Sequence, residues 1–365
     1  MPLLSPVLKR RLDEKFARVA ENQAFLVESV TNIETAKAMA VEPALQTRWE
    51  KQLAAYVQSG FKARQIANWG SESIQLVSKL SSAIILYIGA KRVMDADMTV
   101  GDLDVQMLAR SRSSHLLLSL EACDFGISPT NWQKSVHPKP FHQKIEVIFD
   151  GIDTDRASPA DNVQLTTGDL TLRSGEEVLT YVARNLEPYR GFRTFMHALP
   201  KILERRPSAR IVVVGGNGVS YGSKPKGFKS WRDAMLAEVH LDTSRVHFIE
   251  RLAYDDLLTL FRISRAHVYL TYPFVLSWSC LEAMACGTLV IGSDTPPVRE
   301  VIEHGKNGLL TDFFDADALA EQAIDALARP NRYDALKREA RKTMIERYDV
   351  HKCVRDQLTF IANFR

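Results

Sequence analysis

Short apolar runs alternate with amphipathic stretches along the chain from Leu116 onward. Six runs rich in β-branched residues predict buried strands, each followed by a helical pattern, at 178–184, 210–216, 245–250, 267–272, 288–293 and 307–312. Such alternation favours an α/β fold, a parallel sheet with helices on both faces. Ligands of that architecture bind outside the carboxyl ends of the strands, so we expect the site there.

The segment before this region has a different pattern. Residues 5–68 carry helical periodicity and many charges, with apolar residues such as Ile33, Ala36 and Met39 recurring at three and four. Residues 74–90 are nearly long enough to span a bilayer, but Gln75 and Lys79 interrupt them. Two interpretations stay open: a membrane helix packed on others or lining a wet cavity, and a buried core helix of a soluble domain.

Composition narrows the class of protein. At 365 residues with 45% hydrophobic and 25% charged residues, the chain is globular and long enough for two or three domains. A net charge of +3 does not favour nucleic acid as a partner. The four cysteines form no CxxC pair, so neither a metal site nor a disulfide framework is expected. The N-terminus becomes charged too early for a cleavable signal, which favours a cytoplasmic location.

Two arginines follow the first predicted strand of the sheet. In "ARNLEPYRGF", Arg184 ends the strand and Arg190 precedes Gly191, which permits a tight entry into the next helix. Two guanidinium groups near a helix N-terminus suit a diphosphate, because each can form paired charge-assisted hydrogen bonds. The alternative is that both are solvated surface arginines.

Two further features fall at predicted strand ends. Gly215 and Gly216 follow a strand in "VVVGGNGVSYG", where they would let backbone amides approach a ligand or simply form a flexible turn. In "CLEAMACG" we expect Glu282 on the first helical turn, kept ionised by the helix dipole and able to accept hydrogen bonds from sugar hydroxyls. The alternative is a residue that only stabilises its helix terminus.

Together these stretches resemble the donor-binding half of family 4 glycosyltransferases, in the exopolysaccharide-type branch. The resemblance spans about Leu116 to Tyr348, with "FDGIDTD" (149–155) similar to the interdomain linker and 281–310 similar to the donor-site core. It implies the C-terminal half of the GT-B fold, a Rossmann-like doubly wound sheet. It also implies that Arg184 and Arg190 hold the donor diphosphate and that Glu282 holds the ribose hydroxyls. A second glutamate of the family pattern is replaced by Phe274, so this branch is expected to recognise its donor differently.

Residues from about Ser5 to Leu103 resemble the transmembrane domain of ABC exporters of bacterial type I secretion. The family pattern would continue as an apolar helix, but "DVQMLARSRSSH" follows instead. No GxxxxGK[ST] phosphate loop is present, so an ATPase half is missing. The resemblances imply an all-α, long-helix exporter-like segment at 1–112, a remnant of the GT-B N-terminal domain with the linker at 113–152, and a donor-binding domain at 153–365.

The resulting hypothesis is a retaining hexosyltransferase that moves a sugar from a nucleotide diphosphate sugar to a saccharide or lipid-linked acceptor, without a cofactor or metal. Candidate donor-binding residues are Arg184, Arg190, Gly191, Gly215, Gly216 and Glu282, and no catalytic residue is assigned. Because most of the acceptor domain is missing, an inactive transferase stays open. Two alternatives also stay open: a membrane-associated exporter fragment, anchored at the inner membrane through residues 69–94, and a nucleotide-sugar epimerase with the same fold.

Overall fold

The computed structural model describes residues 113–363 and isolated positions between 16 and 87. It has two compact units, Met1–Phe125 and Gly126–Arg365. In the first unit, the isolated positions and residues 113–122 are helical. Most of the expected exporter-like segment at 1–112, including most of 69–94, lies outside the described residues. No helix within the described residues is long and apolar enough to cross a membrane.

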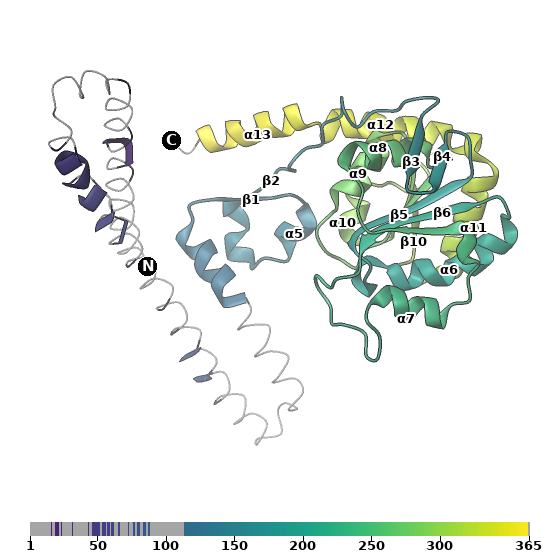
Figure 1. Ribbon diagram of the computed structural model, residues 1–365, viewed down its shortest axis with the longest axis horizontal. Helices are drawn as coiled ribbons and strands as arrows, with labels where there is room; N and C mark the ends of the chain where they lie inside the picture. The colour runs from purple at the N-terminus through teal and green to yellow at the C-terminus, as the bar shows by residue number, and fades with distance from the viewer. Residues whose placement is uncertain are drawn as a thin grey trace. The chain divides into compact units, whose positions relative to one another are not determined.

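The second unit is built around a six-stranded sheet in which every pairing is parallel (Figure 1). Its strands are β5 (Val178–Asn185), β6 (Arg210–Gly216), β7 (Val246–Ile249), β8 (Ala266–Tyr269), β9 (Leu289–Ser293) and β10 (Leu309–Thr311). All six predicted strands are therefore confirmed. The order β10-β9-β8-β5-β6-β7 reverses direction between β5 and β8, which places the topological switch point between these two strands.

Helices cover both faces of this sheet, as the sequence pattern predicted (Figure 1). The helices of the second unit are α5 (Asn131–Ser135), α6 (Phe192–Arg205), α7 (Trp231–Glu238), α8 (Tyr254–Ile263), α9 (Trp278–Ala285), α10 (Pro296–Arg299), α11 (Ala316–Ala328), α12 (Asp334–Arg347) and α13 (Val350–Ala362). Four short 3-10 turns are η1 (Lys139–Lys144), η2 (Pro188–Arg190), η3 (Thr243–Arg245) and η4 (Pro330–Tyr333). Leu179 and Tyr181 of β5 pack with α6 and α11, whereas α8, α9 and α12 pack over the other face.

Two small sheets flank the main one. The antiparallel pair β3 (Gln164–Thr167) and β4 (Leu170–Arg173) covers part of the apolar face near α8. The parallel pair β1 (Gly126–Ser128) and β2 (Ile145–Val147) belongs to the predicted GT-B remnant. The Glu300 carboxylate accepts hydrogen bonds from the backbone N–H groups of Asn131 (2.8 Å) and Trp132 (2.6 Å) at the start of α5. The start of α5 is thus held against Glu300, next to α10, by a charge-assisted cap.

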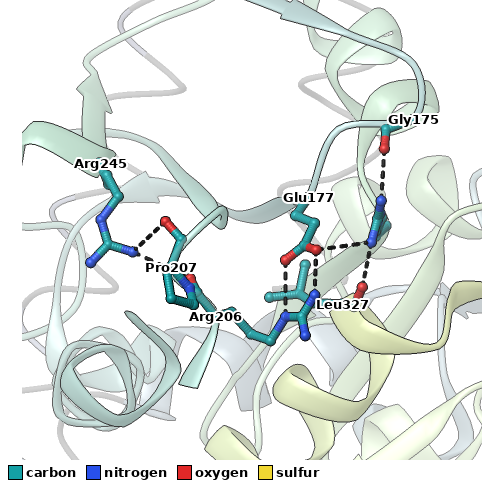
Figure 2. Close-up of polar contacts among 7 residues, drawn as sticks. Gly175, Glu177, Arg206, Pro207, Arg245 and Leu327 are labelled. Atoms are coloured by element: carbon teal, nitrogen blue, oxygen red, sulfur yellow. Dashed lines mark hydrogen bonds and ion pairs between the residues drawn. The ribbon is translucent and has the colours of Figure 1, made fainter. Parts of the chain in front are cut away.

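A charged cluster lies at the amino ends of β5 and β8, and Figure 2 shows its polar contacts. Glu177, directly before β5, accepts two hydrogen bonds from Arg206 and forms an ion pair with Arg265, which precedes β8. Arg265 also donates to the carbonyl oxygens of Gly175 and Leu327. The side chains of Glu177, Arg206 and Arg265 are mostly buried, so their contacts fix the starts of β5 and β8. The carboxyl ends of the strands lie at the opposite edge.

Candidate donor site

A cavity of about 330 Å³ lies at the carboxyl ends of β5 and β8, at the switch point. We call it the central cavity, and its lining includes Arg184, Arg190, Tyr269, Phe274 and Trp278. Side chains from the two segments that follow β5 and β8 therefore meet here. This is the position at which a doubly wound sheet is expected to hold its ligand.

Arg190 is held at the cavity wall by its backbone and by two aromatic rings. The buried Tyr181 hydroxyl donates to the Arg190 carbonyl oxygen at 2.6 Å, and burial raises the pKa of Tyr181, so this donor stays protonated. The Arg190 guanidinium carbon lies 5.2 Å from the ring centroid of Tyr221 and 5.3 Å from that of Phe274. Cation–π contacts of this kind orient a guanidinium without neutralising it.

Gly191 joins η2 to α6 in a conformation that other residues rarely adopt. Its φ is 71°, in the left-handed region, and a Cβ atom added there would lie 2.2 Å from the Cβ of Leu270. Both the backbone and the space therefore require glycine at this position. The turn brings the N-terminus of α6 beside Arg190, which is the arrangement expected for a phosphate.

Arg184 lines the central cavity and also borders a second, outer cavity. This outer cavity has a volume of about 830 Å³, and Arg184, Gly216, Glu250, Arg251 and Leu252 are among its lining residues. Arg184 is exposed, and within residues 113–363 neither Arg184 nor Arg190 forms an ion pair with a carboxylate. Two uncompensated guanidinium groups thus border one cavity.

The two candidate glycines have different positions. Gly216 lines the outer cavity, whereas Gly215 does not line either cavity. A Cβ atom on Gly215 would lie 2.7 Å from the carbonyl oxygen of Ala183, so this glycine permits close packing at the strand end. We conclude that Gly215 serves the packing of the sheet and that only Gly216 lies where a ligand could approach.

Glu282 is placed differently from the expectation. It is the fifth residue of α9, on the second turn, and its side chain lies within the protein, with Glu282 5% exposed. The Tyr254 hydroxyl donates to its carboxylate at 2.9 Å, and Glu282 is not among the residues that line the two cavities. Burial raises the pKa of Glu282, with the Tyr254 hydrogen bond opposing it. The expected first-turn position is wrong, because α9 begins at Trp278 and places Glu282 on the following turn, in a buried environment that disfavours the charged form.

Glu187, which no sequence pattern singled out, organises a loop of the site. This residue is 1% exposed, and its Oε2 atom accepts hydrogen bonds from the backbone N–H groups of Ser220 (3.3 Å), Tyr221 (3.2 Å) and Gly222 (3.3 Å). The contacts hold the β6–α7 loop so that Tyr221 reaches Arg190. A glutamate in the "NLEPYRG" turn was visible in the sequence, but its partners lie more than 30 residues away.

No group of three or more His, Cys, Asp or Glu side chains within the described residues could hold a metal ion. The charged groups that face the central cavity are the two arginines. The arrangement can therefore bind an anion whose charge it compensates through guanidinium groups and the start of α6.

Comparison with protein families decides the class of this domain. Residues 166–343 match the family "Glycosyl transferases group 1", and residues 89–157 match "Glycosyl transferase family 4 group". The C-terminal part of this chain is a group 1 glycosyltransferase domain. It has the GT-B glycosyltransferase fold expected from the sequence.

Solved structures share the fold of this glycosyltransferase domain. Sucrose-phosphate synthase from Thermosynechococcus elongatus superimposes with a TM-score of 0.55 at 21% identity, covering 67% of this chain and 59% of that one. HepE from Anabaena, in complex with UDP-glucose, gives a TM-score of 0.55 at 17% identity and covers 69% of this chain and 67% of its own. At these identities the likeness establishes the fold.

The N-terminal part matches a different family. Residues 2–109 match "ABC transporter transmembrane region". Over 100 residues the chain is 50% identical to the toxin RTX-I translocation ATP-binding protein of Actinobacillus pleuropneumoniae and 53% identical to the α-hemolysin translocation ATP-binding protein HlyB of Proteus vulgaris. The match covers 27% of this chain and 14% of each relative. The chain therefore joins a segment that matches the ABC transporter transmembrane family to a glycosyltransferase domain.

Proposed function

We propose that the glycosyltransferase domain binds a nucleoside diphosphate sugar across the switch point, with its diphosphate between Arg184 and Arg190. The observation that carries this proposal is the pair of arginines without carboxylate partners that border one cavity beside the start of α6. Complexes of HepE with UDP-glucose and with UDP support the choice of donor class. The nucleoside would extend past Arg184 into the outer cavity near Gly216.

The proposed reaction transfers the sugar with retention to a hydroxyl of a saccharide or lipid-linked acceptor, in polysaccharide or glycoconjugate synthesis. The bond from the anomeric carbon to the diphosphate breaks with its electron pair on the diphosphate oxygen, a bond to the acceptor oxygen forms, and the acceptor proton passes to the departing diphosphate. Negative charge grows on the departing diphosphate, and the two guanidinium groups would stabilise it. The proposal assigns no residue to the proton transfer, and it requires no metal or cofactor.

Calorimetric titration of the full chain with uridine and guanosine diphosphate sugars tests this proposal. We expect Arg184→Ala and Arg190→Ala each to weaken donor affinity by roughly tenfold to a hundredfold, the value of one or two charge-assisted hydrogen bonds. Arg355→Ala is the matched control, because Arg355 is exposed on α13 and is not among the residues that line the central or the outer cavity. Full affinity in both site variants would contradict the assigned site.

A second role is favoured by the exporter match at residues 2–109. The N-terminal segment would associate with a membrane or with exporter subunits through residues 69–94, without ATPase activity. Fractionation of cells that express the full chain tests this role. Recovery of the chain in the membrane fraction, released only by detergent, supports it, and complete recovery without detergent contradicts it.

A further inference from the structure

A third cavity adjoins the central one and is lined largely by aromatic side chains. This aromatic cavity, of about 180 Å³, includes Tyr189, Tyr221, Tyr272 and Phe274 in its lining. Arg190, Tyr221 and Phe274 line it and the central cavity alike. The packed group of one guanidinium and two rings is therefore the wall that the two cavities share.

The three cavities form an ordered series along the carboxyl edge of the sheet. Arg184 borders both the outer and the central cavity, whereas Arg190 borders both the central and the aromatic cavity. A diphosphate held between the two arginines has its nucleoside on one side and its sugar on the other. With the nucleoside in the larger outer cavity, the sugar end of the donor points toward the aromatic cavity.

The chemistry of the aromatic cavity suits a sugar ring. Tyr189 and Tyr272 are 50% and 48% exposed, and their rings meet edge to face at a centroid distance of 6.1 Å. Rings of this kind offer apolar faces for the C–H face of a pyranose, with hydroxyl groups at their edges. The buried Thr271 hydroxyl accepts from Arg190 at 3.5 Å and donates to the Tyr272 carbonyl oxygen at 2.9 Å, so it fixes the two walls of the cavity relative to each other.

The volume and charge of the cavity restrict the occupant further. About 180 Å³ corresponds to roughly six water molecules at ~30 Å³ each, which is room for one ring and not for a whole nucleotide. No carboxylate lines the cavity, and Arg190 contributes a positive charge. A cationic ligand is therefore disfavoured, while a neutral, hydroxylated ring fits.

We infer that the aromatic cavity is the subsite for the transferred sugar of the donor, with Tyr189 and Tyr272 as its specificity-determining walls. This inference rests on the proposed donor binding. The sugar packs on the tyrosine rings and shares the wall formed by Arg190, Tyr221 and Phe274 with the diphosphate. Recognition of the sugar thus comes from aromatic packing and hydroxyl groups, without a carboxylate in this cavity.

The test separates the sugar's contribution from that of the diphosphate. Affinities of the full chain for UDP and UDP-glucose, and for GDP and GDP-mannose, are measured for the wild type, Tyr189→Ala and Tyr272→Ala. We expect each variant to keep its affinity for the nucleoside diphosphate and to lose roughly tenfold in affinity for the matching nucleotide sugar. Phe314→Ala is the control, since Phe314 is an exposed aromatic residue outside the cavity lining.

The outcomes distinguish this inference from the function on which it rests. If the wild type binds neither nucleotides nor nucleotide sugars, the proposed function fails. If it binds both classes and the tyrosine variants lose neither, or lose both equally, the sugar subsite is overturned while donor binding stands. Loss of binding of a free saccharide such as cellobiose with an unchanged donor affinity would instead assign the cavity to the acceptor and overturn the inference.

Discussion

At the scale of single residues, the site is defined by long-range contacts. Arg184, Arg190 and Gly191 were identifiable from the sequence because they lie in one short segment that joins a predicted strand to the next helix. The packing of Arg190 against Phe274 joins positions 84 residues apart, and no local pattern predicts it. For the same reason Glu187 was missed and Glu282 was placed in the wrong turn of its helix.

Glu282 provides a prediction at this scale. If its carboxylate holds the donor ribose, the Tyr254 hydroxyl competes with the ribose for it, because that hydroxyl now donates to Oε1 at 2.9 Å. We expect Tyr254→Phe to keep or increase donor affinity and Glu282→Ala to reduce it by roughly tenfold, the value of one hydrogen bond to a charged group. Titration with a nucleoside diphosphate sugar measures both, and an unchanged affinity in Glu282→Ala would remove this residue from the site.

At the scale of elements, the sequence was a reliable guide to the sheet. The central strands β8 and β9 are fully buried apolar segments, and β5 and β6 are largely buried, so the hydrophobic pattern locates them, while the edge strand β7 is only half-buried. Their order was not predictable from the pattern, because it depends on which strand pairs with β5. That order creates the switch point and so decides which loops line the central cavity.

Glu177 provides a prediction about the opposite edge. We expect Glu177→Gln to lower the free energy of unfolding by about 1.5–3 kcal/mol, since the bonds to Arg206 and Arg265 lose their charge assistance. Donor affinity should stay unchanged, because the cluster lies at the amino ends of the strands (Figure 2). Chemical denaturation and titration measure the two quantities.

The control for Glu177 is Asp317→Asn. Asp317 also pairs with a cation, Lys201, but its side chain is 86% exposed, so its removal should cost less than about 1 kcal/mol. Equal losses in the free energy of unfolding for the two variants would show that burial does not strengthen the contribution of the Glu177 cluster to stability.

At the scale of the whole molecule, the chain joins parts of two protein families. The glycosyltransferase domain was recognisable from several motifs that agree with one another, and family and fold both confirm it. The exporter-like part was recognised by its sequence over about 100 residues, and its match is confirmed, but its expected helical arrangement falls mostly outside the described residues.

Stability of the folded domain should depend on pH through His267. This histidine lies on β8 with its Nδ1 atom 3.1 Å from the Thr180 hydroxyl, and its Nε2 atom has no hydrogen-bond partner within the described residues. Burial lowers its pKa to about 3 from the ordinary 6.5. Between these values the unfolded chain binds more protons than the folded one, so stability is lost as the pH falls below 6.5.

We expect His267→Leu to reduce the pH dependence of the free energy of unfolding. Free energies of unfolding at pH 7.5, 6 and 5 should fall less steeply with acidification in the variant than in the wild type, because leucine cannot take up a proton in the unfolded state. Parallel pH curves for the two proteins would show that His267 does not control the acid sensitivity.

The central claim is that a nucleoside diphosphate binds between Arg184 and Arg190 at the switch point. An experimental structure of the full chain bound to UDP tests it most directly. The account predicts phosphate oxygens at about 2.7–2.9 Å from both guanidinium groups, with the nucleoside in the outer cavity beside Gly216. UDP bound elsewhere on the molecule, or bound here without contact to either arginine, would contradict it.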